Sequence, residues 1–180
     1  LDRLEVLIGW VDQLLLDKIS ERQAVLDVVD DVLAEIGSAE QGSHSSSQAI
    51  ANLMAFLAAP QPGDRIYDPC FGSGNLLLAA WKQVQDAALK HKHFGELAEI
   101  CGVEINEAVF LTGLTRLLIS GVEEPHLESG NCLDRETLNS PVREGFDVVL
   151  SNPPLGGKID PSLYKHSQYS FVTSDSTGLF

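Results

Sequence analysis

The sequence predicts an α/β fold, a parallel sheet of alternating strands and helices that a small helical region precedes. Two patterns predict it: apolar residues at helical spacing over the first 36 residues, then short apolar strands that alternate with amphipathic helices. Strand–helix–strand alternation is typical of a parallel sheet. The chain has 180 residues, 44% of them hydrophobic, which is enough for one domain with a small appendage. We expect the helical region over residues 1–40 and the α/β domain over residues 41–180.

Two helices are predicted within residues 1–36. Apolar side chains recur at helical spacing from Leu4 to Ile19 and again from Ala24 to Ile36. Ser20 and Gln23 have the form of a capping box, and Gly37 favours the end of the second helix. Residues 1–40 hold ten acidic and three basic side chains, so we expect a packing appendage with a solvated acidic face. A surface that docks a partner is the alternative.

The α/β region begins with a polar, serine-rich loop over residues 37–48. A helix with apolar Ile50, Leu53, Met54 and Leu57 follows, and Ser46 or Ser47 is the expected cap. The later expected elements are a strand over 65–68, a helix over 75–89, a strand over 100–104, a helix over 106–120, and strands over 126–128 and 146–151. Residues 155–180 are expected to form a long loop.

Composition excludes several classes of protein. A net charge of −14 argues against a free-standing nucleic-acid binder, so contact with DNA must be local or lie on another subunit. No apolar run approaches the roughly 18 residues of a membrane span, and no secretory signal is visible. Three cysteines far apart, without ligand-like spacing to histidine, favour reduced thiols, a cytoplasmic location and no metal site. Because Met54 is the one methionine, we expect a piece of a longer chain.

The first segment with chemical potential is Asp68-Pro69-Cys70-Phe71-Gly72-Ser73-Gly74, between a strand and a helix. Glycines let the backbone approach a ligand, and a helix N-terminus offers unpaired N–H groups. It is not a dinucleotide fingerprint, because Leu77 stands where a third glycine is needed, and no P-loop lysine follows. An acid beside a glycine turn suits a ligand with a cationic centre. A plain strand-to-helix turn is the alternative.

Two further segments end predicted strands. Glu104 could accept hydrogen bonds from both hydroxyls of a ribose, or could only cap the helix that starts near Glu107. Asn152 is followed by Pro153 and Pro154, which stiffen the turn and remove two backbone donors. Fixed acceptors at a strand's carboxyl end suit an amine donor such as an exocyclic NH₂ group, although Asn-Pro-Pro as a mere turn is ordinary.

In this order, the segments resemble those of the amino-methyltransferases that use S-adenosylmethionine. They resemble more closely the N6-adenine DNA methyltransferases, and among these the modification subunit of type I restriction–modification systems. The similarity runs from about residue 42 to residue 152. It includes residues 42–47, Gly-Ser-His-Ser-Ser-Ser, like the cofactor motif before the first strand, and residues 130–133, Gly-Asn-Cys-Leu, like the segment after the third. The resemblance implies a Rossmann-like methyltransferase sheet, here incomplete because its later strands are missing.

The resemblance also implies roles for individual residues. Those expected to bind S-adenosylmethionine are Ser46, Ser47, Asp68, Cys70, Phe71, Gly72, Gly74, Glu104 and Asn131. Of these, Ser46 would hold the methionine carboxylate, Asp68 would lie near the amino group, Glu104 would bind the ribose and Asn131 would face the adenine. The catalytic motif is Asn152, Pro153, Pro154 and Leu155. The Asn152 side chain and the Pro153 carbonyl would accept hydrogen bonds from the target amine.

The implied activity is methyl transfer to the N6 amine of adenine in DNA. Two acceptors on the amine hydrogens expose its lone pair, and the base must leave the duplex at a cost of a few kcal/mol. The implied partners are DNA, reached through a specificity subunit or a missing domain, and the specificity and restriction subunits, with no membrane and no metal. The 180 residues alone could be inactive, since the sheet needs further strands.

The sequence departs from the family at two places. Leu155 replaces the usual aromatic residue, whose stacking on a base is worth roughly 1–3 kcal/mol. Ser46 and Ser47 replace the usual Thr-Pro. Two alternatives therefore stay open: a methyltransferase that acts on protein glutamine or on a guanine amine in RNA, and a scaffold that keeps the fold without catalysis.

Overall fold

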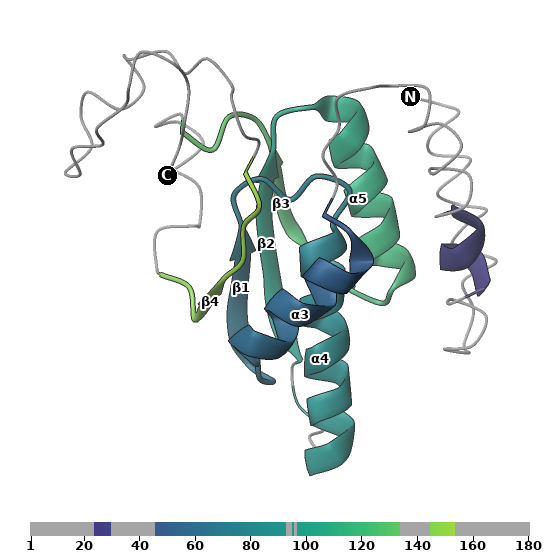
Figure 1. The fold of residues 1–180 in the computed structure, drawn as a ribbon, viewed down its shortest axis with the longest axis vertical. Coiled ribbons are helices and arrows are strands. Elements are labelled where there is room, and N and C mark those ends of the chain that lie inside the picture. Colours follow the sequence, from purple (N-terminus) through teal and green to yellow (C-terminus); the bar gives the residue numbers. More distant parts are fainter. Residues whose placement is uncertain (1–23, 30–45, 93–94, 96, 134–144, 154–180) are drawn as a thin grey trace.

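A computed structural model describes residues 24–29, 46–92, 95, 97–133 and 145–153. Within the predicted helical region, residues 24–29 are helical, as expected (Figure 1). The rest of that region, the loop up to residue 45 and the tail after residue 153 lie outside the described residues. Two residues of the expected catalytic motif, Pro154 and Leu155, are therefore among those that the structure does not describe.

The described strands form a four-stranded sheet in the order β3-β2-β1-β4, and every neighbouring pair is parallel (Figure 1). The strands are β1 (Asp64–Asp68), β2 (Ala98–Glu104), β3 (His126–Ser129) and β4 (Val148–Val149). The chain moves outward from β1 to β3 and then returns to the other side of β1 with β4. In open α/β sheets, ligands bind at the carboxyl ends of the strands where the order reverses in this way. Here that point lies between β1 and β4.

Three helices lie on one side of the sheet: α3 (Gln48–Ala58), α4 (Asn75–His91) and α5 (Glu107–Ile119) (Figure 1). Their buried side chains and alternate residues of the strands form the main core. The fully buried aliphatic side chains of this core include Ile66, Leu77, Val84, Ile100 and Leu117. A second, smaller cluster holds Tyr67, Cys101 and Val103, the strand residues of opposite parity. The period of two therefore divides each strand between two faces.

Side chains and glycines fix where the helices begin. Ser47 caps α3, since its Oγ accepts a hydrogen bond from the Ile50 N–H. Asn106 caps α5, because its side chain accepts from the Ala108 and Val109 N–H groups. Gly74 caps α4 with a φ of +85°, a left-handed conformation that favours glycine.

Most element bounds differ from the sequence prediction by one or two residues, and two of the differences have a clear structural cause. The helix expected from residue 106 starts at Glu107, because Asn106 serves as its cap. The strand expected over 146–151 pairs only at Val148 and Val149. In the described part of the chain β4 has β1 as its single neighbour, and Phe146 turns to stack on Tyr67 at 4.4 Å between ring centroids. Local apolar pattern alone did not show where this pairing ends.

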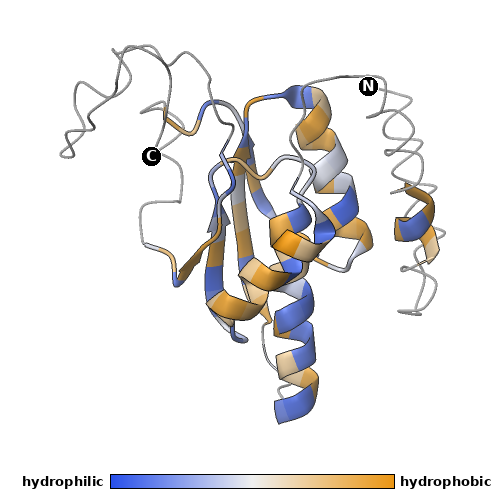
Figure 2. Ribbon diagram, viewed as in Figure 1, coloured by the Kyte–Doolittle hydropathy of each residue, from blue (hydrophilic) through white to orange (hydrophobic). Residues whose placement is uncertain are grey.

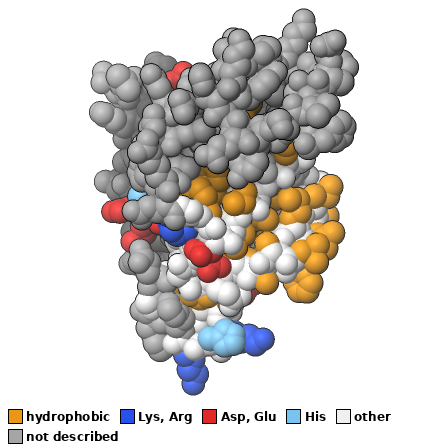
Figure 3. Space-filling view, turned by 90° about the vertical axis from the view of Figure 1, so that its left-hand side faces the viewer, with side chains coloured by type: hydrophobic (Ala, Val, Ile, Leu, Met, Phe, Trp, Pro, Cys, Tyr) orange, Lys and Arg blue, Asp and Glu red, His pale blue; other side chains and the backbone are white. Residues whose placement is uncertain are grey.

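The outer face of α3 is apolar. Ile50, Leu53, Phe56 and Leu57 are 52–72% exposed, and Figures 2 and 3 show these hydrophobic colours on the side where α3 lies. The opposite face of α3 packs through Ala51 and Ala55. None of the helices within the described ranges has both the length and the apolar composition needed to cross a bilayer.

Candidate active site

A pocket opens at the carboxyl end of β1, next to the point where the strand order reverses. Its volume is about 270 Å³, including the open mouth. Three separate parts of the sequence meet there, and the lining residues are Ser46, Asp68, Cys70, Phe71, Gly72, Ser73, Asn75, Leu76 and Asn152. Two of the three segments that the sequence singled out as chemically active thus share one pocket, and Ser46 joins them although 106 positions separate it from Asn152.

Asp68 is the acidic group of the pocket and is 1% exposed. Its Oδ1 accepts a hydrogen bond of 2.9 Å from the Cys70 N–H, whereas Oδ2 has no hydrogen-bond partner among the described residues. Burial raises the pKa of Asp68 to about 7, and the charge of Glu104 adds to this rise. A buried carboxylate oxygen without a partner is costly. A cationic donor from a ligand would remove that cost.

The start of α4 adds backbone N–H donors to the lining of the pocket. α4 begins there at Asn75, and the first N–H groups of a helix favour a negative charge. The Arg116 side chain, 5% exposed, donates from Nη1 to the Ser73 carbonyl and, at 2.7 Å, to Asn75 Oδ1. One pocket therefore offers a carboxylate and a helix N-terminus that a guanidinium supports. This pair matches the ammonium and carboxylate groups of an α-amino acid.

Gly72 gives this pocket its open floor. Its φ is +58°, and a Cβ built there would meet only the Cys70 carbonyl, at 4.0 Å. Since Gly72 lines the pocket, a side chain at this position would take up space that a ligand needs. The expectation that Gly72 allows close approach of the backbone therefore has a geometric basis.

Phe71 lines the pocket, but its ring lies in the core. Its ring is 3% exposed and packs in the core, with the Phe110 ring centroid 5.7 Å away. A Cβ at Gly102 would lie 2.8 Å from this ring, and one at Gly113 would lie 2.6 Å from it. Phe71 can therefore contact a ligand only through its backbone, while its side chain anchors the glycine loop against β2 and α5.

Glu104 does not cap α5, which was the alternative that the sequence left open. Its carboxylate instead accepts from the Gly72 N–H at 3.0 Å and from the Asn106 N–H at 2.8 Å. The end of β2 is thus tied to the glycine loop after β1. Glu104 does not line the pocket, but its carboxylate lies beside the pocket's glycine floor.

Ser46 and Asn152 meet at the pocket. Asn152 is exposed, and its Nδ2 donates to Ser46 Oγ at 2.9 Å. This bond leaves Asn152 Oδ1 available as a hydrogen-bond acceptor. Pro153 is half-buried beside it. Ser47, in contrast, does not line the pocket and serves as the cap of α3.

The segment after β3 approaches the glycine loop through sulfur atoms. Cys132 Sγ lies 3.8 Å from Cys70 Sγ, and neither cysteine is in a disulfide. Asn131 precedes Cys132 and accepts a hydrogen bond from the Leu133 N–H. Asn131 does not line the pocket, and neither does Gly74. Gly74 faces α5 instead, since a Cβ added to it would lie 3.6 Å from the Gly113 backbone.

Sequence reasoning missed three residues that shape the site. Asn75 was predicted only as the start of a helix, and Arg116 and Gly113 were not singled out. A lone arginine among the leucines of an apolar helix was the available signal for Arg116, because such a charge needs buried partners. No local signal marks Gly113, whose importance comes from its contact with a loop about 40 residues away in the sequence.

Comparison with known proteins identifies the family of this chain. The family described as N-6 DNA Methylase matches residues 29–177. The type I restriction enzyme EcoEI methylase subunit of Escherichia coli is 30% identical over 169 residues, which cover 89% of this chain and 33% of that protein. The chain thus spans about a third of the length of this relative.

Solved structures share the fold. A structure from a study of complex assembly in a type I restriction–modification system has a TM-score of 0.69 and 22% identity, and covers 94% of this chain and 35% of the other. The methyltransferase subunit of the type I system of Streptococcus thermophilus has a TM-score of 0.55 and 24% identity, with 69% of this chain and 26% of the other covered. With the family match over most of its length, the chain belongs to the N-6 DNA methylase family.

Proposed function

We propose that this chain carries the cofactor-binding pocket and the catalytic asparagine, Asn152, of an adenine-N6 DNA methyltransferase. The chain would be part of the modification subunit of a restriction–modification system. The observation that carries the proposal is the hydrogen bond from Asn152 to Ser46 at the pocket. It brings an exposed amide with an available carbonyl oxygen next to a site suited to an amino acid group. Membership of the N-6 DNA methylase family supports the N6 atom of adenine as the proposed target of methylation.

The polar groups of the pocket suit the methionine part of S-adenosylmethionine. Asp68 Oδ2, which lacks a hydrogen-bond partner within the described residues, would receive the ammonium group. The Ser46 hydroxyl accepts from Asn152 and so can donate its own proton to the carboxylate. When bound, S-adenosylmethionine supplies an electrophilic methyl group on a sulfonium.

The adenosine part would extend past the pocket toward the ends of β2 and β3. Glu104 already accepts two backbone N–H groups and keeps further lone pairs for ribose hydroxyls. Asn131, after β3, is the proposed contact for the cofactor's adenine. The strand order supports this path, since β1, β2 and β3 are consecutive neighbours and their carboxyl ends share one edge.

Asn152 would act on the target amine. Its Nδ2 is held by Ser46, so Oδ1 and the Pro153 carbonyl are proposed to accept the two amine hydrogens. An adenine amine is a poor nucleophile because its lone pair is delocalised, and two such bonds favour the pyramidal form. The rest of the rate increase would come from holding the amine nitrogen in line with the methyl group of the cofactor.

We also propose that DNA reaches this site with the help of other subunits or of other parts of the chain. The net charge of −14 supports this, because the phosphates of DNA repel an acidic surface. The proposed partners are the specificity and restriction subunits, and the cytoplasm is the proposed location. Co-purification of the full-length chain with a co-expressed specificity subunit tests the partnership.

The activity is tested by transfer of a labelled methyl group from S-adenosylmethionine to duplex DNA, with the full-length chain and its specificity subunit. Asn152→Ala should lower transfer by at least about 100-fold, because a misplaced amine loses most of the positioning effect. Its affinity for the cofactor should stay within about 3-fold of the original in calorimetry. Asn52→Ala, at an exposed amide on α3, is the matched control and should leave both quantities unchanged.

The same assay separates the alternatives. If RNA or protein is labelled instead of DNA, the substrate of the protein belongs to that class. Cofactor binding without transfer to any of the three would favour a scaffold that has lost catalysis. Normal transfer by Asn152→Ala would contradict the proposed role of this residue.

A further inference from the structure

A line of hydrogen bonds connects the buried Arg116 of α5 with the exposed Asn152. Arg116 Nη1 donates to Asn75 Oδ1 at 2.7 Å. Asn75 Nδ2 donates to the Ser46 carbonyl at 2.7 Å. Asn152 Nδ2 donates to Ser46 Oγ at 2.9 Å. Four residues from four parts of the sequence thus form one connected network at the pocket.

Asn75 is the junction of this network. An amide side chain has an acceptor end and a donor end, and here each is committed to a different partner. Arg116, which is 5% exposed, can only donate, so it fixes Oδ1 toward itself and turns Nδ2 toward Ser46. The orientation of the Asn75 amide is therefore set by a buried cation.

Ser46 is held at its carbonyl and at its hydroxyl. The Asn75 bond fastens the backbone of Ser46 to the first turn of α4, next to the glycine loop. The hydroxyl of the same residue receives Asn152. A shift of the Ser46 backbone would therefore move the group on which the Asn152 amide rests. Reaction rates respond steeply to such shifts, since a displacement of about 1 Å can cost roughly 100-fold.

We propose that Asn75 is a positioning residue for the transfer step, which acts through Ser46 to set where Asn152 presents its acceptor. The inference rests on the proposed function, in which Asn152 receives the target amine. It goes further by assigning a residue that contacts neither the target amine nor the reacting methyl group. The network also links the cofactor-binding pocket to Asn152, because Ser46 lines the pocket and accepts the hydrogen bond from Asn152.

Asn75→Asp is the sharpest test. The carboxylate keeps an acceptor for Arg116, so the buried cation stays paired and the fold is preserved. The donor to Ser46 is lost, and two oxygen atoms face each other where a bond of 2.7 Å stood. We expect kcat for methyl transfer to fall at least about 10-fold in the full-length chain with its specificity subunit. The rate is measured at saturating S-adenosylmethionine, because the new carboxylate lies at the pocket and should raise KM for the cofactor. The melting temperature should stay within a few degrees.

Asn52→Asp is the matched control. It makes the same chemical change in an exposed hydrogen bond on α3, where Gln48 Nε2 donates to Asn52 Oδ1, and kcat should not change. A second comparison covers the case in which Asn75→Asp fails to fold. Ser46→Ala removes the acceptor of Asn152 and should lower kcat, while Ser46→Thr keeps a hydroxyl and should restore it. Equal kcat values for the alanine and threonine variants would overturn the inference.

Asn152→Ala, measured in parallel, separates this inference from the proposed function. If Asn152→Ala keeps normal transfer, the proposed function itself fails. If Asn152→Ala abolishes transfer while Asn75→Asp keeps the original kcat, only the role of Asn75 is wrong. Loss of kcat at saturating cofactor in both variants, with the melting temperature retained, supports the two together.

Discussion

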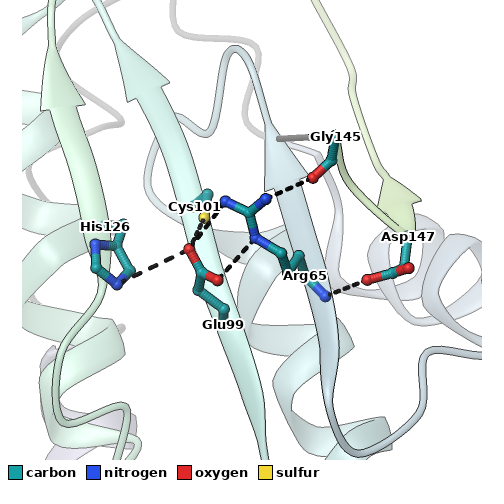
Figure 4. Close-up of polar contacts among 6 residues, drawn as sticks. All are labelled: Arg65, Glu99, Cys101, His126, Gly145 and Asp147. Atoms are coloured by element: carbon teal, nitrogen blue, oxygen red, sulfur yellow. Dashed lines mark hydrogen bonds and ion pairs between the residues drawn. The ribbon is translucent and has the colours of Figure 1, made fainter. Parts of the chain in front are cut away.

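The two ends of β1 carry opposite charges in opposite situations. Arg65, at the amino end, donates to Glu99 at 2.8 Å and to the Gly145 carbonyl at 2.8 Å (Figure 4). Its guanidinium also lies 5.3 Å from the centre of the Phe146 ring. Asp68, at the carboxyl end, has one backbone partner and one oxygen without any partner in the described part of the chain. Arg65 is also the less buried of the two, since its side chain is 21% exposed against 1% for the Asp68 residue.

The difference separates a charge that stabilises the fold from one whose carboxylate lacks a compensating partner among the described residues. The Arg65 cluster also includes Asp147, whose carboxylate accepts from the Arg65 N–H, and His126, 3.9 Å from Glu99 (Figure 4). These contacts join neighbouring strands or the residues that lead into them, so the cluster fixes the register of the sheet. The Asp68 side chain, within the described ranges, bonds only to the Cys70 N–H of its own turn. A charge buried without compensation is tolerated in proteins mainly at functional sites.

Asp68→Asn should give the largest effect. Loss of the carboxylate removes the charged partner of the proposed ammonium group, so affinity for S-adenosylmethionine should fall about 100-fold in calorimetry. The ligand-free protein should become more stable at pH 8, by at most on the order of 4 kcal/mol, because a buried negative charge disappears. Asp64→Asn makes the same change at the amino end of β1, where Oδ2 accepts from the Gln61 N–H, and should leave cofactor affinity unchanged.

The pH dependence has a defined sign. The ordinary pKa of an aspartate is 3.8, and burial raises that of Asp68 to about 7. Between these values the folded state keeps a proton that the unfolded chain has released. Asp68 therefore lowers the free energy of unfolding as the pH rises from about 4 to about 7. Denaturant unfolding at several pH values should show this slope in the original protein and not in Asp68→Asn. The same slope in Asp68→Asn as in the original protein would contradict the unpaired state of Asp68.

Gly113→Ala should have the next largest effect, and only at the carboxyl end of β1. Its Cβ would lie 2.8 Å from the Gly72 carbonyl and 2.6 Å from the Phe71 ring, so the glycine loop would have to move. Overpacking of this kind costs about 1–3 kcal/mol of unfolding free energy, and cofactor affinity should fall as well. Thr112→Ala, one position earlier on α5, is the control. Unaltered cofactor binding in Gly113→Ala would show that the loop tolerates the displacement.

Arg65→Met should give the smallest effect and leave the cofactor site unaffected. We expect a loss of about 1–2 kcal/mol in unfolding free energy, since the ion pair with Glu99 is only partly exposed. Arg65 holds the pKa of Glu99 below its usual value, so the pair stabilises the protein above that value and loses its effect as the pH falls through the lowered pKa. The variant should lack this acid-dependent loss. A drop in cofactor affinity would remove the contrast between the two ends of β1.

Most of the fold could be predicted from local pattern, because helices and parallel strands have different apolar periods. The strand at 126 and the helices after residues 74 and 106 were found within one to two residues of their bounds. The strand at 146–151 was predicted too long, because pairing with β1 ends after Val149. The local sequence does not determine which strand pairs with which. It also does not determine the stacking of Phe146 on Tyr67.

The sequence by itself singled out the segments that we expect to carry chemistry: the glycine turn after Asp68, the acid at 104 and the amide at 152 have local reasons in backbone freedom and strand ends. Only the tertiary structure decided that Ser46 meets Asn152, that Asn75 is turned by Arg116, and that Gly113 makes room for Phe71. Each of these contacts joins residues roughly 40 or more positions apart. Such distances close only when β1 and β4 lie side by side and α5 packs against α4, so the contacts depend on burial across the whole sheet rather than on any one segment.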